Sequence, residues 1–165
     1  MKKLNVLLIA ILFLITVTTT ASAGTIIMDN DALPGSGTTN PTLGQDFGSQ
    51  NMWYIKSDTC YNGDAERGVS SEGCQYCWEH NIPVTGRGTL QVYLWHSTFT
   101  DPNADYFVWK LTNWPEFGTL NQDKADAGWN VVGSASVTSG VRDFGVRGTL
   151  WASTYLGADA IKYTY

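Results

Sequence analysis

The residues in this sequence best suited to binding chemistry are aromatic side chains beside short acidic and amide-rich segments. A sugar ring presents an apolar C–H face that stacks on an exposed indole or phenol, while nearby carboxylates and amides bond its hydroxyl groups. The alternative is that such aromatics pack in the core, as we expect for Trp78 and Trp129. The expected ligand-binding residues are Tyr93, Trp95, Tyr106, Trp114, Asp101, Asn103 and Asp105.

The segment from Asp101 to Asp105 has a second interpretation, because Asp-Pro-Asn-Ala-Asp imitates the first half of a calcium-binding loop. It lacks the turn glycine and the distal bidentate glutamate that an EF-hand supplies. We therefore favour a polar turn that caps two strands. A structural Ca²⁺ held by Asp29 or Asp159 at the strand ends is an alternative that the spacing does not require. We expect no other cofactor.

Three cysteines, Cys60, Cys74 and Cys77, lie close together in the sequence. In an oxidising compartment, one disulfide and one remaining thiol are expected. Positions i and i+3 of an extended strand are about 10 Å apart, beyond the ~7 Å limit for a disulfide, so Cys60 is expected to pair with either Cys74 or Cys77. A zinc site formed by these cysteines and His80 is the weaker alternative, because Cys74 and Cys77 would face opposite sides of a regular strand.

Catalytic motifs are absent from the sequence. Its only histidines are His80 and His96, and it contains no G-x-S-x-G, H-E-x-x-H or G-x-x-x-x-G-K-[ST] motif. Two carboxylates across a cleft would form a glycosidase pair, but nothing in the sequence brings two of them together. We therefore predict that the protein is not an enzyme.

The scaffold that must position these residues is expected to be all-β, an antiparallel, jelly-roll-like sandwich. Short aromatic and β-branched runs alternate with Gly, Asn, Asp, Pro and Ser clusters, and no long window has helical apolar spacing. In the run 89–97, Leu90, Val92 and Leu94 form an apolar face. Polar stretches at 31–50 and 61–73 are expected to be loops. The expected strands are 25–29, 52–56, 75–82, 89–97, 106–112, 129–132, 134–138, 141–146, 149–152 and 160–163.

The N-terminal residues predict export. Lys2 and Lys3 precede an apolar run over residues 4–17, and Ala21-Ser22-Ala23 has the small-x-small pattern of a signal-peptidase site. The run is shorter than the ~20 residues of a membrane span. We therefore expect a cleaved signal peptide at 1–23, one domain at 24–165, and a secreted location, extracellular or periplasmic. The formal net charge of −5 argues against nucleic acid and anionic membrane as partners.

Several motifs, taken in chain order, resemble those of a known family. They include Ile26-Ile27-Met28-Asp29-Asn30, Pro83-x-x-Gly86, Gly128-Trp129-Asn130-Val131-Val132-Gly133 and Ala158-Asp159-Ala160-Ile161. This order resembles the golvesin C-terminal/xanthan-lyase carbohydrate-binding-domain-like module over nearly all of residues 24–165, which implies a secreted bacterial β-sandwich. The chain departs from the family in its cysteine-bearing segment, in His96, where the family tends to carry Trp, and in the Pro/Thr-rich loop after Asn30.

Two functions from different classes remain as predictions. The first is a carbohydrate- or cell-surface-binding module, whose exposed aromatic residues form the platform for a polysaccharide or cell-surface glycan. The second is a structural subunit of an extracellular matrix or filament. Such a subunit would self-associate through strand edges, for example at the chain end Tyr163-Thr164-Tyr165, and through the spare cysteine. The resemblance does not imply lyase activity, because that chemistry belongs to a different domain.

Overall fold

The computed structural model describes residues 23–30, 52–109, 114–151 and 153–165, and this part of the chain is built almost entirely from strands. The expected loop 31–50 and nearly all of the expected signal peptide lie outside the described residues. The strands are β1 Thr25–Met28, β2 Met52–Lys56, β3 Asp64–Val69, β4 Gln75–Ile82, β5 Gly86–Leu94, β6 Ala104–Trp109, β7 Glu116–Leu120, β8 Gly128–Val137, β9 Gly140–Arg147, β10 Tyr155–Ala158 and β11 Ile161–Thr164. Three short 3-10 helices are η1 Tyr61–Gly63, η2 Ser70–Glu72 and η3 Gln122–Lys124.

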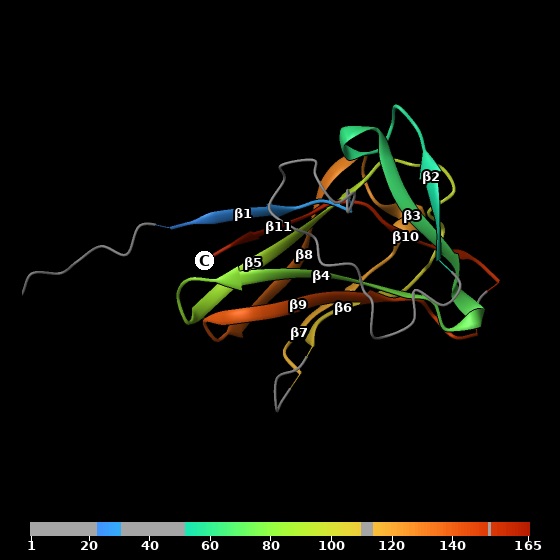
Figure 1. The fold of residues 1–165 in the computed structure, drawn as a ribbon. Helices are drawn as coiled ribbons and strands as arrows, with labels where there is room; N and C mark the ends of the chain where they lie inside the picture. Colours follow the sequence, from blue (N-terminus) through green and yellow to red (C-terminus); the bar gives the residue numbers. More distant parts are fainter. Residues whose placement is uncertain (1–22, 31–51, 110–113, 152) are drawn as a thin grey trace, which may run out of the picture.

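The strands form three antiparallel sheets, which confirms the expected all-β sandwich. One four-stranded sheet has the order β1-β11-β5-β8, and the other has the order β4-β9-β6-β7. These two sheets are the layers of the sandwich, and the small sheet β10-β3-β2 lies at one end of them (Figure 1). Each described pair of neighbouring strands is antiparallel.

The core between the layers follows from the alternation of side chains along each strand. On β5, Leu90, Val92 and Leu94 are 1%, 0% and 3% exposed, as the sequence predicted. On β6, Tyr106 and Val108 belong to the same core cluster. Because β6 lies between β9 and β7, its alternate residues form the outer face of the second sheet. One face of β6 therefore lies in the core, and the opposite face carries the buried Phe107 between the half-buried Asp105 and Trp109.

A β-bulge on β8 fits that strand against the neighbouring layer. Leu90 pairs with Gly133 and Gln91 pairs with Val131, so β8 carries one extra residue between them. A Cβ atom on Gly133 would lie 2.0 Å from the carbonyl oxygen of Phe117 on β7. Only glycine permits this close approach between a strand of one four-stranded sheet and a strand of the other.

The expected strands differ from the observed ones where the sequence lacks a clear apolar pattern. The bounds of β2 and β4 are as predicted, whereas the run 89–97 becomes β5 at Gly86–Leu94, and the runs 129–132 and 134–138 join as β8. The stretch 61–73 is not a plain loop, because it contains β3 between two 3-10 helices. Residues 149–151 form a turn instead of a strand. The short strands β7 and β10 were not predicted.

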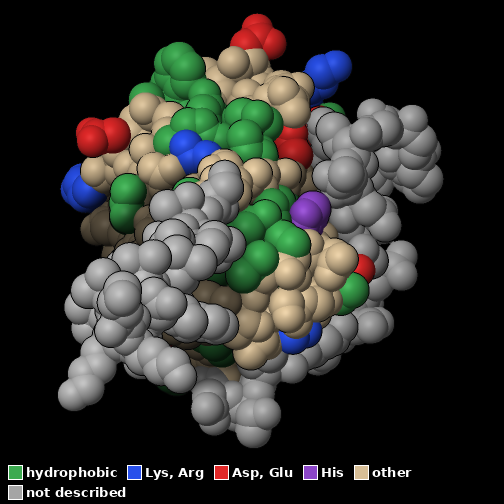
Figure 2. All heavy atoms as spheres, turned by 90° about the vertical axis from the view of Figure 1, so that its left-hand side faces the viewer, with side chains coloured by type: hydrophobic (Ala, Val, Ile, Leu, Met, Phe, Trp, Pro, Cys, Tyr) green, Lys and Arg blue, Asp and Glu red, His purple; other side chains and the backbone are tan. Residues whose placement is uncertain are grey.

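Hydrophobic side chains also reach the surface. On the face seen in Figure 2 they form several separate groups, with acidic and basic side chains scattered around them. The large hydrophobic residues that are exposed are Ile27, Trp53, Tyr54, Val84, Trp95, Trp114, Val131, Val141, Leu150, Trp151 and Tyr155. In the described part of the chain, no helix has the length and hydropathy needed to cross a membrane.

Candidate functional site

Two of the predicted ligand-binding residues are buried, which corrects the sequence-based expectation. Tyr106 is 0% exposed, because β6 directs it into the core, where its hydroxyl accepts a hydrogen bond from Nε2 of Gln122 at 2.9 Å. The same Gln122 is bonded to both the carbonyl and the N–H of Gly157 on β10. Asp101 is also 0% exposed. Both residues therefore stabilise the fold, and neither remains a candidate ligand contact.

The carboxylate of Asp101 accepts hydrogen bonds from both the segment that leads into β6 and the turn at 148–151, and so connects the two. Its Oδ1 accepts the backbone N–H of Asn103 at 2.8 Å, as in an Asx turn. It also accepts the hydroxyl of Thr149 at 2.8 Å, while Oδ2 accepts the Thr149 N–H at 2.8 Å. Residues 101–103 thus form a polar turn that leads into β6, as the sequence analysis favoured, and this turn fixes the position of the one that follows β9.

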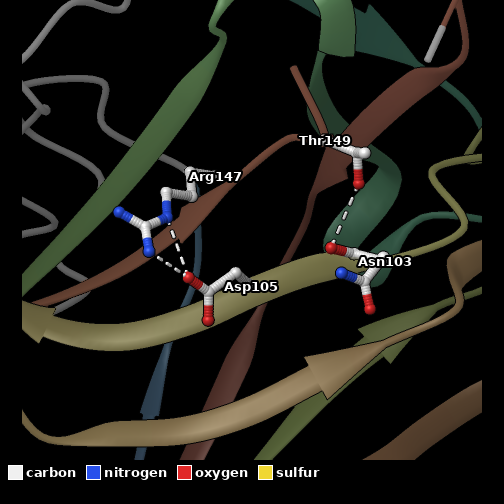
Figure 3. A network of polar contacts seen from close by, with 4 residues as sticks. All are labelled: Asn103, Asp105, Arg147 and Thr149. Atoms are coloured by element: carbon white, nitrogen blue, oxygen red, sulfur yellow. Dashed lines mark hydrogen bonds and ion pairs between the residues drawn. The ribbon is translucent and has the colours of Figure 1, made fainter. Parts of the chain in front are cut away.

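A surface hollow of about 420 Å³ opens beside these two segments, and we call it the Trp151 hollow. Asn103 and Asp105, two of the predicted residues, line it together with residues 73–75 and 147–151. Asp105 and Arg147 are directly paired across β6 and β9. Arg147 contacts Oδ2 of Asp105 through its Nε at 2.8 Å and its second terminal nitrogen at 2.6 Å. Figure 3 shows this guanidinium turned toward the carboxylate, with the Thr149 hydroxyl directed at the Asn103 carbonyl.

The turn after β9 presents two apolar side chains at the rim of the hollow. Trp151 is 93% exposed and Leu150 is 57% exposed. The turn begins at Gly148, where a Cβ atom would lie 2.9 Å from Cα of Ser70. The close approach of these two segments holds the turn against the body of the sandwich. An indole that is almost wholly exposed on a fixed turn is a platform for stacking, with hydrogen-bonding groups within the same hollow.

Aromatic residues continue from the hollow along the outer face of β6. The guanidinium carbon of Arg147 lies 5.2 Å from the centre of the Phe107 ring, so the polar pair and the aromatic row adjoin. Phe107 lies 5.7 Å from Trp109, and Trp109 lies 4.2 Å from Trp114 between ring centres. Trp114 is 44% exposed. Three predicted residues, Asn103, Asp105 and Trp114, therefore belong to one strip on the β4-β9-β6-β7 sheet.

The other two predicted aromatics lie on different surfaces. Tyr93 is half-buried on the outer face of the β1-β11-β5-β8 sheet, where its ring centre is 5.4 Å from those of Tyr61 and Trp129. Trp129 is therefore not a core residue as expected, and the Nζ atom of Lys162 lies 4.5 Å from the centre of its ring. Trp95 is 54% exposed and lines a separate hollow of about 170 Å³, together with His96, Gln122, Asp123, Ala125 and Ala127 among others.

The three cysteines differ from the expectation, because none forms a disulfide in the structure. All three are buried, and they have different surroundings. Burial and the charge of Asp159 raise the pKa of Cys60 to about 12, whereas burial and Asp101 raise that of Cys74 to about 12. Cys77 faces away from the core, toward Gly145. Within the described residues, no group of three or more His, Cys, Asp and Glu side chains is arranged to hold a metal, so the alternative zinc site is not assembled.

The acidic residues singled out for calcium do lie in one neighbourhood. Asp29 and Asp64 both raise the pKa of the fully buried Asp159, although burial itself is the largest cause, and that pKa is about 8. The backbone N–H of Tyr61 donates to both carboxylate oxygens of Asp159, at 3.1 and 3.0 Å. The amide of Asn62 donates to Asp29 at 2.6 Å. These carboxylates are satisfied by protein donors in the present arrangement.

The sequence analysis did not identify Trp151 and Arg147, the two residues on which the candidate site most depends, nor Leu150, Phe107 and Trp109 beside them. Trp151 fell within an expected strand, where its exposure could not be seen. Arg147 joins Asp105 through the pairing of β9 with β6, two strands that are far apart in the sequence. The only available signal was that Gly148, Thr149 and Leu150 separate an apolar run from a lone Trp, a pattern typical of a turn.

Comparison with known proteins identifies the fold. No protein-family model matches the sequence, and no curated protein is significantly similar to it. Among solved structures, Paenibacillus xanthan lyase matches with a TM-score of 0.57 at 17% identity, over 84% of this chain and 13% of that one. A family 35 carbohydrate binding module from Clostridium thermocellum matches with a TM-score of 0.53 at 16% identity, over 87% of this chain and 98% of that one.

A third similar structure is a Podospora anserina GH26-CBM35 β-(1,4)-mannanase, with a TM-score of 0.57 at 10% identity. The alignment covers 85% of this chain and 27% of the mannanase. The present chain thus spans only a small part of the two enzymes, but nearly the full length of the separate binding module. At these identities the similarity shows the fold alone, which is the fold of carbohydrate-binding modules.

Proposed function

We propose that the chain is a secreted, non-catalytic carbohydrate-binding module, and that the Trp151 hollow is its main ligand site. The observation that carries the proposal is the placement of a 93% exposed indole next to the Asp105–Arg147 pair and Asn103. The indole supplies a stacking surface for the apolar face of a sugar ring. The carboxylate, guanidinium and amide supply acceptors and donors for its hydroxyl groups.

The strip along β6 suggests that the ligand is a polymer. Asp105, Phe107 and Trp109 follow one another at alternate positions, about 13 Å from the first to the last at the usual rise of a strand. Phe107 is only 1% exposed, so the part of this strip that a ligand can reach is the polar pair at one end and the half-buried Trp109 at the other. Trp114 adds a further exposed ring at that end. A strip of this length fits more than one sugar residue, which is why we propose a polysaccharide or a cell-surface glycan.

The comparisons support the class of function but not its details. The similar structures include a family 35 carbohydrate binding module and two larger enzymes named for polysaccharides. Together with the motifs around Trp129 and Asp159, they support assignment to the golvesin/xanthan-lyase carbohydrate-binding-domain-like group. We assign no catalytic role. His96, which follows the exposed Trp95, is bonded at Nδ1 to the hydroxyl and N–H of Thr98 within its own turn.

A depletion assay tests the proposal. The chain and two single variants, Trp151→Ala and Trp95→Ala, are mixed with a panel of soluble and insoluble polysaccharides, and the protein lost from solution is measured. Loss of a stacking platform costs about 2 kcal/mol, or roughly 30-fold in Kd. We expect that loss for Trp151→Ala and a change of less than about twofold for Trp95→Ala, because Trp95 lies in the other hollow.

Three outcomes would contradict parts of this account. Equal binding by Trp151→Ala and the parent chain would remove the Trp151 hollow as the site. A loss confined to Trp95→Ala would move the site to the smaller hollow. No depletion by any polymer, together with elution of the protein as large assemblies, would favour the structural subunit. The structural subunit was expected to link chains through a spare cysteine, and the burial of all three cysteines argues against such a link.

A further inference from the structure

Arg67 on β3 is held between two aromatic rings on the small third sheet. Its guanidinium carbon lies 5.1 Å from the ring centre of Trp53 and 4.6 Å from that of Tyr155. Trp53 is the direct partner of Arg67 across β2 and β3, and Tyr155 lies on β10, on the other side of β3. The two rings stand edge to face, 6.2 Å apart at 85°. Trp53 and Tyr155 are each 37% exposed and Arg67 is half-buried, so the clamp lies at the surface of the small sheet.

This guanidinium has no carboxylate partner among the described residues. The ion pairs in that part of the chain join Lys124 to Asp123 and Arg147 to Asp105. Nε of Arg67 is buried and has no hydrogen-bond partner there. An arginine carries five N–H donors, and an acidic chain with 15 Asp and Glu residues offers many acceptors. An arginine that is positioned by aromatic rings and left unneutralised is suited to an anion from outside the chain.

The clamp lies close to the smaller hollow, which His96 lines. The charge of Arg67 contributes, after burial, to the lowered pKa of His96, so the two groups interact electrostatically. His96 lines the smaller hollow next to Trp95 and Phe99. On β10, the residue directly opposite Arg67 is Gly157, where the ring of the buried Phe99, which also lines the smaller hollow, occupies the position of a Cβ atom. The clamp therefore adjoins a second concave surface, separate from the Trp151 hollow.

We propose that Arg67, Trp53 and Tyr155 form a second ligand site that recognises an anionic sugar residue in an acidic polysaccharide. The planar guanidinium binds the anion, a carboxylate or a sulfate, through the N–H donors of its two terminal nitrogens, because Nε is buried, and an exposed aromatic edge contacts the sugar ring. This inference rests on the proposed carbohydrate-binding function and deepens it by naming a class of ligand. The chain as a whole is acidic, so its net negative charge repels an anionic polymer. Binding must therefore come from the local contacts between the clamp and the anion.

The test compares three polymers and two matched arginine variants of the full chain. The polymers are polygalacturonate, the same polymer fully methyl-esterified, and dextran sulfate. The variants are Arg67→Gln and Arg142→Gln, which remove the same charge. Arg142 is the control because its guanidinium is already bonded to residues of its own turn, including Thr138 and Ser139. We expect Arg67→Gln to weaken binding to an acidic polymer by tenfold or more, and Arg142→Gln to change it by less than about twofold.

Each outcome decides a specific point. Binding to polygalacturonate but not to its ester assigns a carboxylate, and binding to dextran sulfate alone assigns a sulfate. Equal losses in both variants, or no binding to either acidic polymer, would overturn the proposal. Arg67→Lys keeps the charge but loses the planar pair of donors, so an intermediate loss is expected even if Arg67→Gln folds poorly. Trp151→Ala should leave this binding intact, so failure of the main site would be distinguished from failure of the clamp.

Discussion

At the scale of single residues, Asp159 should control how stability depends on pH. Burial, together with Asp29 and Asp64, raises its pKa from the ordinary aspartate range to about 8. Because the folded-state pKa lies above the unfolded value of about 3.9, the group's contribution to stability is fully present below about pH 4 and is lost as the pH rises toward 8. We expect the thermal midpoint to fall by several degrees between pH 5 and pH 8.

The variant Asp159→Asn is the control for this prediction, because an amide oxygen still accepts the N–H of Tyr61 and does not titrate. Its thermal midpoint should depend much less on pH over the same interval. The scans are run with a chelator, since a bound Ca²⁺ would favour the charged carboxylate. The same pH dependence in both proteins would show that Asp159 is not the group responsible.

At the scale of elements, the contact between β7 and β8 depends on the absence of a side chain at the bulge. Gly133→Ala would place a Cβ atom 2.0 Å from the Phe117 carbonyl oxygen and push the two strands apart. Such overpacking costs about 1–3 kcal/mol, and each kcal/mol lowers the thermal midpoint of a domain of this size by about 2–4 °C. Gly86→Ala on β5 is the matched control, since nothing lies within 4 Å of its Cβ position. Equal midpoints for both variants would contradict the observed packing.

Elements with a strong local pattern were predictable, and those that depend on long-range packing were not. The alternation of Leu90, Val92 and Leu94 identified the core face of β5. In β3, by contrast, the buried positions are Ala65 and Gly68, which give no apolar signal beside Asp64, Glu66 and Arg67. These small residues are buried because β2 and β10 flank the strand on both sides, and that arrangement cannot be seen in a local window.

The candidate site was also predictable only in part, because a local pattern identifies some of its residues and strand pairing alone positions the others. Asn103 and Asp105 were identified because they lie at a turn beside an aromatic strand. Tyr106 was included wrongly, because a one-residue step along a strand changes the face, and the face that packs in the core was not known. Arg147 and Trp151 were missed, since only the pairing of β9 with β6 brings them to Asp105.

At the scale of the whole molecule, the three thiols should be protected by the fold. Cys60, Cys74 and Cys77 are at most 6% exposed, and the raised pKa of Cys60 and of Cys74, about 12 each, keeps both thiols protonated near pH 8. We expect a thiol reagent to react very slowly with the native protein and to label three thiols in denaturant without prior reduction. A single labelled thiol in denaturant would instead support the disulfide expected from the sequence.

The central claim is that a glycan binds at the Trp151 hollow, and the most direct test is an NMR titration that resolves the seven tryptophan indole N–H signals. The protein is titrated with soluble fragments of the polysaccharides in the panel, and Trp151→Ala assigns one signal by its loss. We predict that the Trp151 signal shifts most, that the Trp114 signal shifts with longer fragments, and that the signal of the fully buried Trp78 does not move. Shifts confined to Trp95 or Trp129, with Trp151 unchanged, would contradict the account.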